Sequence, residues 1–275
     1  RVSFLMQIFV IFISLLFISP LAAETILEGN FTQGGLVYGK TKPGNVIKLE
    51  KRKLRISSSG SFVFGFSRDT KKRLQLMIDM PNGLSETRII NVEPRKYRMQ
   101  RINGLPKNMI SPPKKVLERI IIENKKIKKV RMRDSNFSFW KSGFVWPAKG
   151  RISGVYGSQR ILNGRPKQPH YGIDIAAPKG RKIFAADSGK VIFSGTKGGY
   201  GKSVLIFHGT EPISGKTYST FYAHQSRIFV KKGDHVQKGD EIGWVGSTGY
   251  ATGPHLHFEL KVNGKHVDPL KFIPN

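Results

Sequence analysis

The chain has 275 residues, of which 39% are hydrophobic and 11% aromatic, which suffices for one large or two modest globular domains and excludes a disordered protein. It has no cysteine, which excludes disulfides, thiolate catalysis, cysteine zinc fingers and a lipid anchor on an N-terminal cysteine, so any metal must be bound by His, Asp or Glu. The net charge of +29 indicates an anionic partner.

The first 23 residues have the pattern of an export signal. One arginine precedes an uncharged, mostly apolar run over residues 2–19, and the small pair Ala22 and Ala23 follows before the first acidic residue. We expect cleavage near Ala23, which places the rest of the chain outside the cytoplasm. A retained membrane anchor is the alternative, because the run is just shorter than the roughly 20 residues of a spanning helix. Since the chain opens on Arg1 rather than Met, we expect that at least one residue precedes it in the full protein.

Residues 24–95 are predicted to form a small β-sandwich-like domain. Short alternating runs such as LVYGK, SFVFGF and RLQLMIDM are separated by turn signals such as KPGN and SSSG. Several short strands at this spacing are typical of an antiparallel sandwich. The segment has no histidine and no clustered carboxylates, so we expect it to bind, space or regulate rather than to catalyse.

Residues 96–144 are predicted to form a basic linker with an amphipathic helix. The helix is indicated by SPPKKVLERIIIENKKIKKVRMRD, which begins with a serine and two prolines, as helices often do. Its apolar stripe must be covered, either by the protein itself or by a membrane surface. The stripe consists of Val116, Ile120, Ile127 and Val130.

The positive charge is densest in this linker, because Lys and Arg exceed Asp and Glu by 12 in residues 95–145. No helix-turn-helix or RNP-like pattern is present, and an exported protein seldom meets chromosomal DNA, so we expect no nucleic-acid partner. The charge instead predicts attraction to an anionic envelope polymer or membrane surface. A lysine-rich solvated surface is the alternative.

Residues 145–275 again show the pattern of strands. In the strand HLHFELKV, which turns at Asn263-Gly264, alternation places His255, His257 and Glu259 on one face and the apolar residues on the other. The two histidines then lie about 6.6 Å apart at their Cα atoms, so that one can bind a metal while its neighbour reaches a substrate. The remaining predicted strands are KVIFSG, SVLIFH, TYSTFYAH and EIGWVG.

Three further residues complete a candidate constellation. His170 and Asp174 are four apart in HYGID, and on an ideal strand they would lie about 13 Å apart, too far to bind one zinc. The chain must therefore bend between them, and Gly172 permits the bend. His224 ends the run YSTFYAH. Any one of these residues alone is a weak signal, but five of them cluster in a strand-rich segment, whereas the first 169 residues contain no histidine.

These motifs resemble peptidase family M23, the lysostaphin and LytM-like zinc metallopeptidases. The resemblance rests on HYGIDIAAPKG, YAH, GSTGYATGPHLHFEL and VNGKHVDP, and covers residues 145–275. It implies an antiparallel β-sheet peptidase domain and one zinc ion per chain, with His170, Asp174 and His257 as ligands and His224 and His255 as catalytic residues. The stretch SGVYGSQRILNGRPKQPHYG is also similar to the envelope enzymes of Gram-negative bacteria in this family, which implies a periplasmic location.

The resemblance implies an exported zinc endopeptidase that hydrolyses peptide cross-links of peptidoglycan, with the bond between D-Ala and meso-diaminopimelate as the expected target. A non-catalytic LytM-like regulator that binds the wall and activates other hydrolases is the alternative. Such domains typically lose zinc or catalytic positions, whereas all five are present here. No HExxH motif supplies a glutamate base, so the base must be His224 or His255.

Two roles stay open at this level. His208, at the end of SVLIFH, can support the cleft or belong to the core. Residues 24–144 are expected to restrict access to the zinc site, and the alternative is a spacer whose cations touch anionic lipid or wall polymer.

Overall fold

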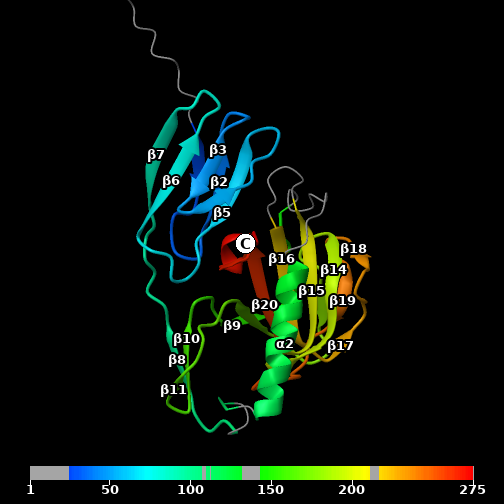
Figure 1. The fold of residues 1–275 in the computed structure, drawn as a ribbon. Helices are drawn as coiled ribbons and strands as arrows, with labels where there is room; N and C mark the ends of the chain where they lie inside the picture. Colours follow the sequence, from blue (N-terminus) through cyan, green and yellow to red (C-terminus); the bar gives the residue numbers. More distant parts are fainter. Residues whose placement is uncertain (1–24, 107–109, 112, 132–142, 211–216, 275) are drawn as a thin grey trace, which may run out of the picture.

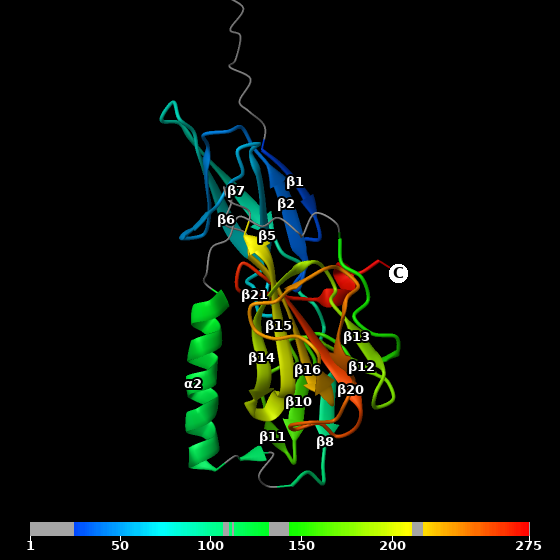
Figure 2. The same ribbon diagram turned by 90° about the vertical axis from the view of Figure 1, so that its right-hand side faces the viewer.

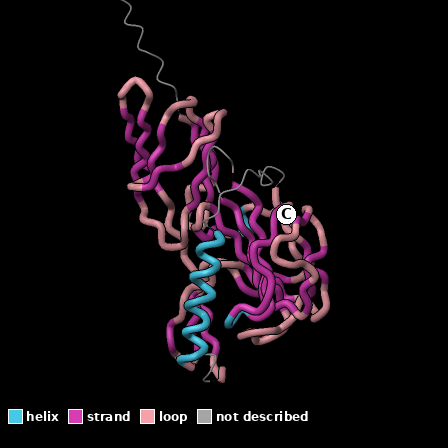
Figure 3. The backbone as a smooth tube through the Cα atoms, turned by 45° about the vertical axis from the view of Figure 1, so that its right-hand side comes forward, coloured by secondary structure: helices cyan, strands magenta, loops and turns pink. Residues whose placement is uncertain are grey.

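The computed structural model describes residues 25–106, 110–111, 113–131, 143–210 and 217–274 (Figure 1). The predicted export signal over residues 1–23 lies outside this part of the chain. Among the described helices, none combines the length and the apolar character needed to cross a bilayer. The fold is mostly strand, as predicted (Figure 3).

The N-terminal domain consists of two sheets that enclose a core of their own, in agreement with the predicted β-sandwich. Strand β5 is buried on both faces, because Phe62 and Phe64 point into this core while Val63 joins the core of the next domain. The first sheet has the order β1 (Ile26–Gly29), β2 (Leu36–Lys40), β5 (Ser61–Gly65). The second has the order β4 (Arg52–Leu54), β3 (Val46–Leu49), β6 (Arg73–Asp79), β7 (Ser85–Asn91).

The linker contributes a strand that the sequence did not predict. Strand β8 (Met99–Ile102) pairs in parallel with β10 (Gln159–Leu162), and β10 turns back into β11 (Arg165–Pro166). The linker is therefore hydrogen-bonded to the C-terminal domain before its helix begins.

Helix α2 (Lys114–Arg131) forms where the sequence predicted it and lies along strand β14 and the turn η2 (Gly198–Tyr200) (Figures 1 and 2). Val116 and Ile120 are half-buried, and a Cβ at Gly198 would lie only 2.8 Å from Ile120 Cγ1. This part of the stripe packs on the protein itself. The side chains of Ile127 and Val130 are not among the described ones.

The C-terminal domain is built on an eight-stranded sheet, and a second sheet of three strands covers one of its faces. The main apolar core of the molecule lies between these two sheets. The large sheet has the order β18 (His235–Val236), β14 (Gly189–Lys197), β15 (Gly201–Thr210), β16 (Thr217–Gln225), β20 (His255–Val262), β12 (Ile173–Ala176), β9 (Arg151–Gly154), with β21 (Lys265–Val267) also paired to β20. The small sheet has the order β13 (Lys182–Phe184), β19 (Glu241–Trp244), β17 (Arg227–Ile228), and the turn η3 (Pro269–Lys271) follows β21.

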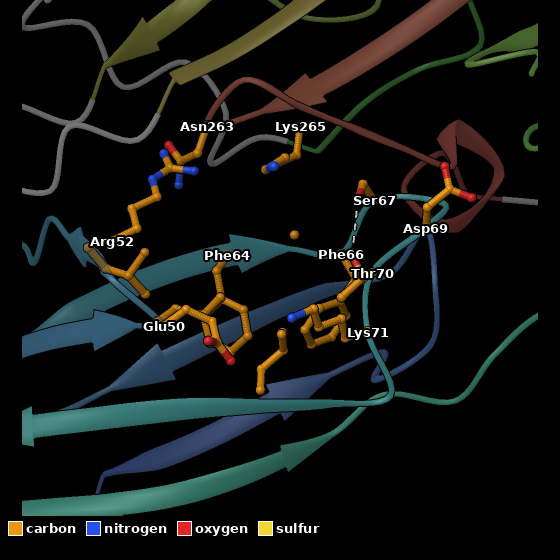
Figure 4. Close-up of a pocket in the computed structure, with 14 residues that line it drawn as sticks. Glu50, Arg52, Phe64, Phe66, Ser67, Asp69, Thr70, Lys71, Asn263 and Lys265 are labelled. Carbon is orange, nitrogen blue, oxygen red and sulfur yellow. Dashed lines mark hydrogen bonds between the residues drawn. The ribbon is translucent and has the colours of Figure 1, made fainter. Parts of the chain in front are cut away.

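A cavity of about 380 Å³ lies between the sandwich and the β20–β21 hairpin (Figure 4). Phe64 and Phe66 contribute aromatic surface to it, and Asn263 and Lys265 reach it from the hairpin. None of the five predicted site residues lines this cavity, so the candidate site lies elsewhere.

Candidate active site

The pairing of β12 with β20 brings two of the predicted ligands together. Asp174 lies directly opposite His257 in this antiparallel pair. Side chains of directly opposed residues share one face of the sheet, so their polar atoms can meet. His170 reaches the same point from the loop before β12.

Three ligand atoms converge at this point. His170 Nε2, Asp174 Oδ1 and His257 Nδ1 each lie 2.9 Å from the other two, and all three residues are buried. Zinc bonds of about 2.0–2.2 Å in a tetrahedron place ligand atoms roughly 3.3 Å apart. The residues therefore fit a zinc site with only a slight expansion, and the donors are of the kind that zinc binds.

The chain bends at Gly172, as the sequence predicted, but glycine is required there by a close approach of β20 and not by a left-handed backbone. A Cβ at this position would lie 2.3 Å from the carbonyl oxygen of Phe258 and 3.1 Å from His257 Cε1. Strand β20 thus passes too close for any side chain. This close approach is what seats His257 against the HYGID segment.

The two predicted catalytic histidines lie beside the cluster. The imidazole of His224 lies 4.7 Å from that of His255 and 6.0 Å from that of His257, measured between ring centroids. His255 Nε2 is 3.8 Å from Asp174 Oδ1. The structure therefore brings all five predicted residues into one site.

The four imidazoles of the site share one arrangement, in which the outer ring nitrogen faces a carbonyl or carboxylate oxygen. Such oxygens only accept hydrogen bonds, so the outer nitrogen carries a proton, and the inner nitrogen offers a lone pair to the site whenever the ring is neutral. The outer contacts are His170 Nδ1 to Val155 O at 3.2 Å, His224 Nδ1 to Thr248 O at 2.8 Å, His255 Nδ1 to Gly253 O at 2.8 Å, and His257 Nε2 to Glu259 Oε1 at 3.2 Å. Metal-binding histidines are typically oriented in this way.

The electrostatics of the cluster favour a cation. Burial acts to lower the pKa of His257, but hydrogen bonds to Asp174 and Glu259 outweigh it and raise the pKa to about 9. Burial acts to raise the pKa of Glu259, yet the neighbouring His266 and His257 hold it well below its usual range. An environment that favours a proton on His257 favours a metal cation at the same nitrogen.

His224 has the opposite character. Burial, followed by the nearby His257 and His255, lowers the pKa of His224 to about 3. Its imidazole is therefore neutral at ordinary pH, and its inner nitrogen carries a lone pair.

Two neighbours of the site were not predicted. Tyr200 places its ring 5.5 Å from that of His257, and its hydroxyl donates to Glu259 Oε1 at 3.5 Å. Arg160 donates from Nη2 to Asp174 Oδ2 at 2.5 Å. Arg160 lies in the stretch SGVYGSQRILNGRPKQPHYG, whose resemblance to envelope enzymes is the one signal that could have marked it, and no local pattern indicates the position of Tyr200.

His208 is not part of the site. It is fully buried beside Phe144, with Nδ1 2.8 Å from the carbonyl oxygen of Ser188 and Nε2 2.6 Å from Thr220 Oγ1. Of the two roles that the sequence left open, the structure shows the core role.

Residues 168–269 match the model of peptidase family M23. The C-terminal domain belongs to this family. A crystal structure of a putative peptidase M23 from Pseudomonas aeruginosa superposes with a TM-score of 0.67 at 26% identity, covering 89% of this chain and 95% of that one. The likeness therefore extends from the M23 domain into the N-terminal half.

Curated relatives match less than half of the chain. The chain is 46% identical over 120 residues to the DD-carboxypeptidase/endopeptidase Mpg of Neisseria meningitidis, covering 44% of this chain and 26% of that one. It is 39% identical over 125 residues to the peptidoglycan DD-endopeptidase ShyA of Vibrio cholerae, covering 45% and 28%. It is 35% identical over 134 residues to the murein hydrolase activator NlpD of Escherichia coli, covering 48% and 32%. The chain thus spans less than a third of the length of these relatives, which include both endopeptidases and an activator.

Proposed function

We propose that the protein is an exported, zinc-dependent endopeptidase of the cell envelope that hydrolyses peptide cross-links of peptidoglycan. The observation that carries the proposal is the convergence of five residues, in which three ligand atoms lie 2.9 Å from one another and the imidazoles of His224 and His255 lie beside them. Two relatives named as endopeptidases support the substrate class. The expected bond joins D-Ala to meso-diaminopimelate.

In this proposal His170, Asp174 and His257 hold one zinc ion per chain. When bound, zinc would lower the pKa of a coordinated water from 15.7 to about 7 and would polarise the scissile carbonyl. Three protein ligands leave the position for that water open.

His224 and His255 divide the remaining chemistry. The imidazole of His224 is neutral and leaves its inner nitrogen unprotonated, and the ring of His255 lies 4.7 Å from it, with His255 Nε2 3.8 Å from Asp174 Oδ1. One of the pair, as a neutral ring, removes the proton of the attacking water, and the other, as an imidazolium protonated at its inner nitrogen as well, donates to the oxyanion that develops on the substrate. Their carbonyl contacts at Nδ1 hold both rings in the required orientation.

The second candidate function is that of an activator of other wall hydrolases, favoured by the likeness to NlpD. The complete set of five residues favours the enzyme, because an activator that only binds needs neither the ligands nor the inward-facing bases.

The test is to incubate the purified, zinc-loaded chain with peptidoglycan and to identify the released fragments by mass spectrometry. We expect cross-linked fragments to be converted to uncross-linked ones, with loss of the reaction on chelation and recovery on adding zinc. Asp174→Ala should lose both metal and activity, because one of three ligands is removed. Stoichiometric zinc in that variant would contradict the ligand assignment. A zinc-loaded chain that releases nothing alone, yet accelerates an added wall hydrolase, would establish the activator.

A further inference from the structure

The two carboxylate oxygens of Asp174 have different partners. Oδ1 faces His170 and His257 at 2.9 Å, whereas Oδ2 accepts from Arg160 Nη2 at 2.5 Å. The Asp174 side chain is 9% exposed and that of Arg160 is 30% exposed, so the pair lies at the edge of the buried cluster. Arg160 thereby occupies one oxygen and leaves the other to bind a cation together with the histidines.

The guanidinium of Arg160 has a second partner in the linker. Its Nε donates to Gln100 Oε1 at 3.3 Å, and Arg160 lies directly opposite Gln100 in the parallel pairing of β10 with β8. A planar guanidinium with fixed donors can hold two acceptors in one geometry, which a lysine ammonium does less well. The orientation of Arg160 toward Asp174 thus depends on a residue outside the M23 domain.

Strand β8 is fixed to the hairpin that carries Arg160 at both of its ends. At one end the amide of Gln159 donates to the carbonyl of Arg98 at 2.9 Å. At the other the amide of Asn163 donates to the carbonyl of Ile102 at 2.9 Å, and the Asn163 side chain bonds both backbone groups of Leu105. These bonds fix the register in which Gln100 meets Arg160.

His170 is supported from the same direction. The carbonyl of His170 accepts from the amide of Gly157 at 2.7 Å, and the carbonyl of Gly157 accepts from Arg68 Nε at 2.7 Å. A Cβ at Gly157 would lie 2.1 Å from the ring of Tyr97, so the linker is in direct contact with this turn. Two of the three proposed ligands, His170 and Asp174, are therefore held through hydrogen bonds that lead to residues preceding the M23 domain.

We propose that Arg160 is a positioning residue for the zinc ligand Asp174 and that strand β8 holds Arg160 in place through Gln100. The segment before the M23 domain is then a structural part of the site, in addition to any effect it has on access. This inference rests on the proposed zinc site.

A competing effect has the opposite sign. The charge of Arg160 lies beside a site that binds a dication, so its removal also relieves repulsion and would tighten zinc binding. Loss of an outer partner of a metal ligand typically weakens binding by roughly 10- to 100-fold. The direction of the change in zinc affinity therefore shows which effect is larger. We expect positioning to prevail, because among the described residues the hydrogen bond that holds Asp174 Oδ2 comes from Arg160.

The test measures the zinc dissociation constant of the full chain by chelator competition, together with the thermal unfolding midpoint of the metal-free form. Arg160→Gln should raise the dissociation constant roughly 10- to 100-fold. Arg160→Lys should lie between this variant and the native chain, because it keeps the charge and loses the two-point geometry. The matched control is Arg165→Gln on the same hairpin, where an exposed arginine donates to Ser111 Oγ at 3.3 Å and contacts no ligand.

The role of β8 is tested by Gln100→Leu, alone and combined with Arg160→Gln. We expect a smaller loss from the single variant and almost no added loss in the combined one, since Gln100 acts through Arg160. Additive losses would overturn the part assigned to β8.

Native or tighter zinc binding by Arg160→Gln would overturn the assignment of Arg160. So would a lowered midpoint of the metal-free protein with no change in zinc affinity, which is the signature of a merely structural contact. If Arg160→Gln does not fold, Arg160→Lys decides by the same criteria. Absence of zinc binding by the native chain would instead refute the proposed function.

Discussion

His224 combines a functional position with an uncommon backbone conformation. Its φ of 62° lies in the left-handed region, which costs a residue other than glycine about 1–3 kcal/mol. Residues in such conformations are concentrated at active sites. The conformation follows directly after Ala223, the last residue of β16 paired with β20, and brings the imidazole over His255 and His257.

Replacing His224 or His255 by Ala should leave zinc binding intact and lower turnover by roughly 10²-fold or more, the usual effect of losing a positioned acid or base. Zinc content and the rate of wall hydrolysis check this. His224→Asn is the fold control, because Asn tolerates a positive φ, and His235→Ala controls for loss of an exposed histidine. A native rate in either Ala variant would remove that residue from the mechanism.

His208 should make stability depend on pH. Burial lowers its pKa to about 4, below the 6.5 of a free imidazole, so the unfolded state binds more protons between these values. The contribution of His208 to the free energy of unfolding should therefore be largest above pH 6.5 and fall by up to about 3 kcal/mol as the pH drops to 4.

Denaturant unfolding of the native chain and of His208→Gln at pH 7 and pH 4.5 measures this contribution. The variant should lose less stability over this interval, whatever its stability at pH 7. Because other histidines titrate in both proteins, only the difference between them reports on His208. Equal losses would show that this imidazole does not stay neutral in the fold.

At the scale of elements, the strands with strong alternation were predictable and β8 was not. The sequence HLHFELKV alternates polar and apolar residues over eight positions. MQRI has no such alternation, and β8 is stabilised by parallel pairing with a strand 60 residues further along the chain. The residues of the site divide in the same way into predictable and unpredictable ones. The motifs contain the five central residues, but the contact of Arg160 with Asp174 depends on that unpredicted pairing.

Helix α2 is the element for which the sequence left two possible partners, the protein itself and a membrane surface. Its half-buried side meets η2, yet Leu117, Ile121 and Ile122 on the other side are 44–54% exposed. An exposed apolar face flanked by cations is typical of helices that lie on anionic membranes. The flanking exposed cations are Lys114, Lys115, Arg119 and Lys125.

We expect residues 24–275 to bind vesicles with anionic lipid, to bind zwitterionic vesicles much less, and to dissociate as salt rises. Changing Leu117 and Ile121 to Gln should weaken vesicle binding roughly tenfold or more, since two apolar side chains no longer enter the interface. Co-sedimentation measures this, with zinc content as the check on folding. Unchanged vesicle binding by the double variant would leave the charge as the sole source of attraction and favour the wall polymer.

At the scale of the whole molecule, the two domains share their cores. Leu36 and Val63 come from the sandwich, yet they belong to the apolar cluster of the M23 domain. A partly buried ion pair joins the same surfaces, with Arg95 Nη1 2.7 Å from Asp268 Oδ2; the Asp268 side chain is 5% exposed and that of Arg95 is 31% exposed. A detachable spacer would have its own core and a polar, exposed junction, so this interface argues for a single cooperative body.

Tryptophan fluorescence can test whether the two domains unfold together, because all three tryptophans lie after residue 139 and the sandwich contains none. Leu76 is fully buried in the sandwich core, and Leu76→Ala should cost about 2–5 kcal/mol. If the domains unfold together, this change lowers the unfolding midpoint measured by tryptophan fluorescence as much as the midpoint measured by circular dichroism of the whole chain. Ile89→Ala, at a position that is 53% exposed, should move neither. An unchanged tryptophan midpoint beside an early loss of strand signal would mean that the sandwich unfolds alone, as a spacer would.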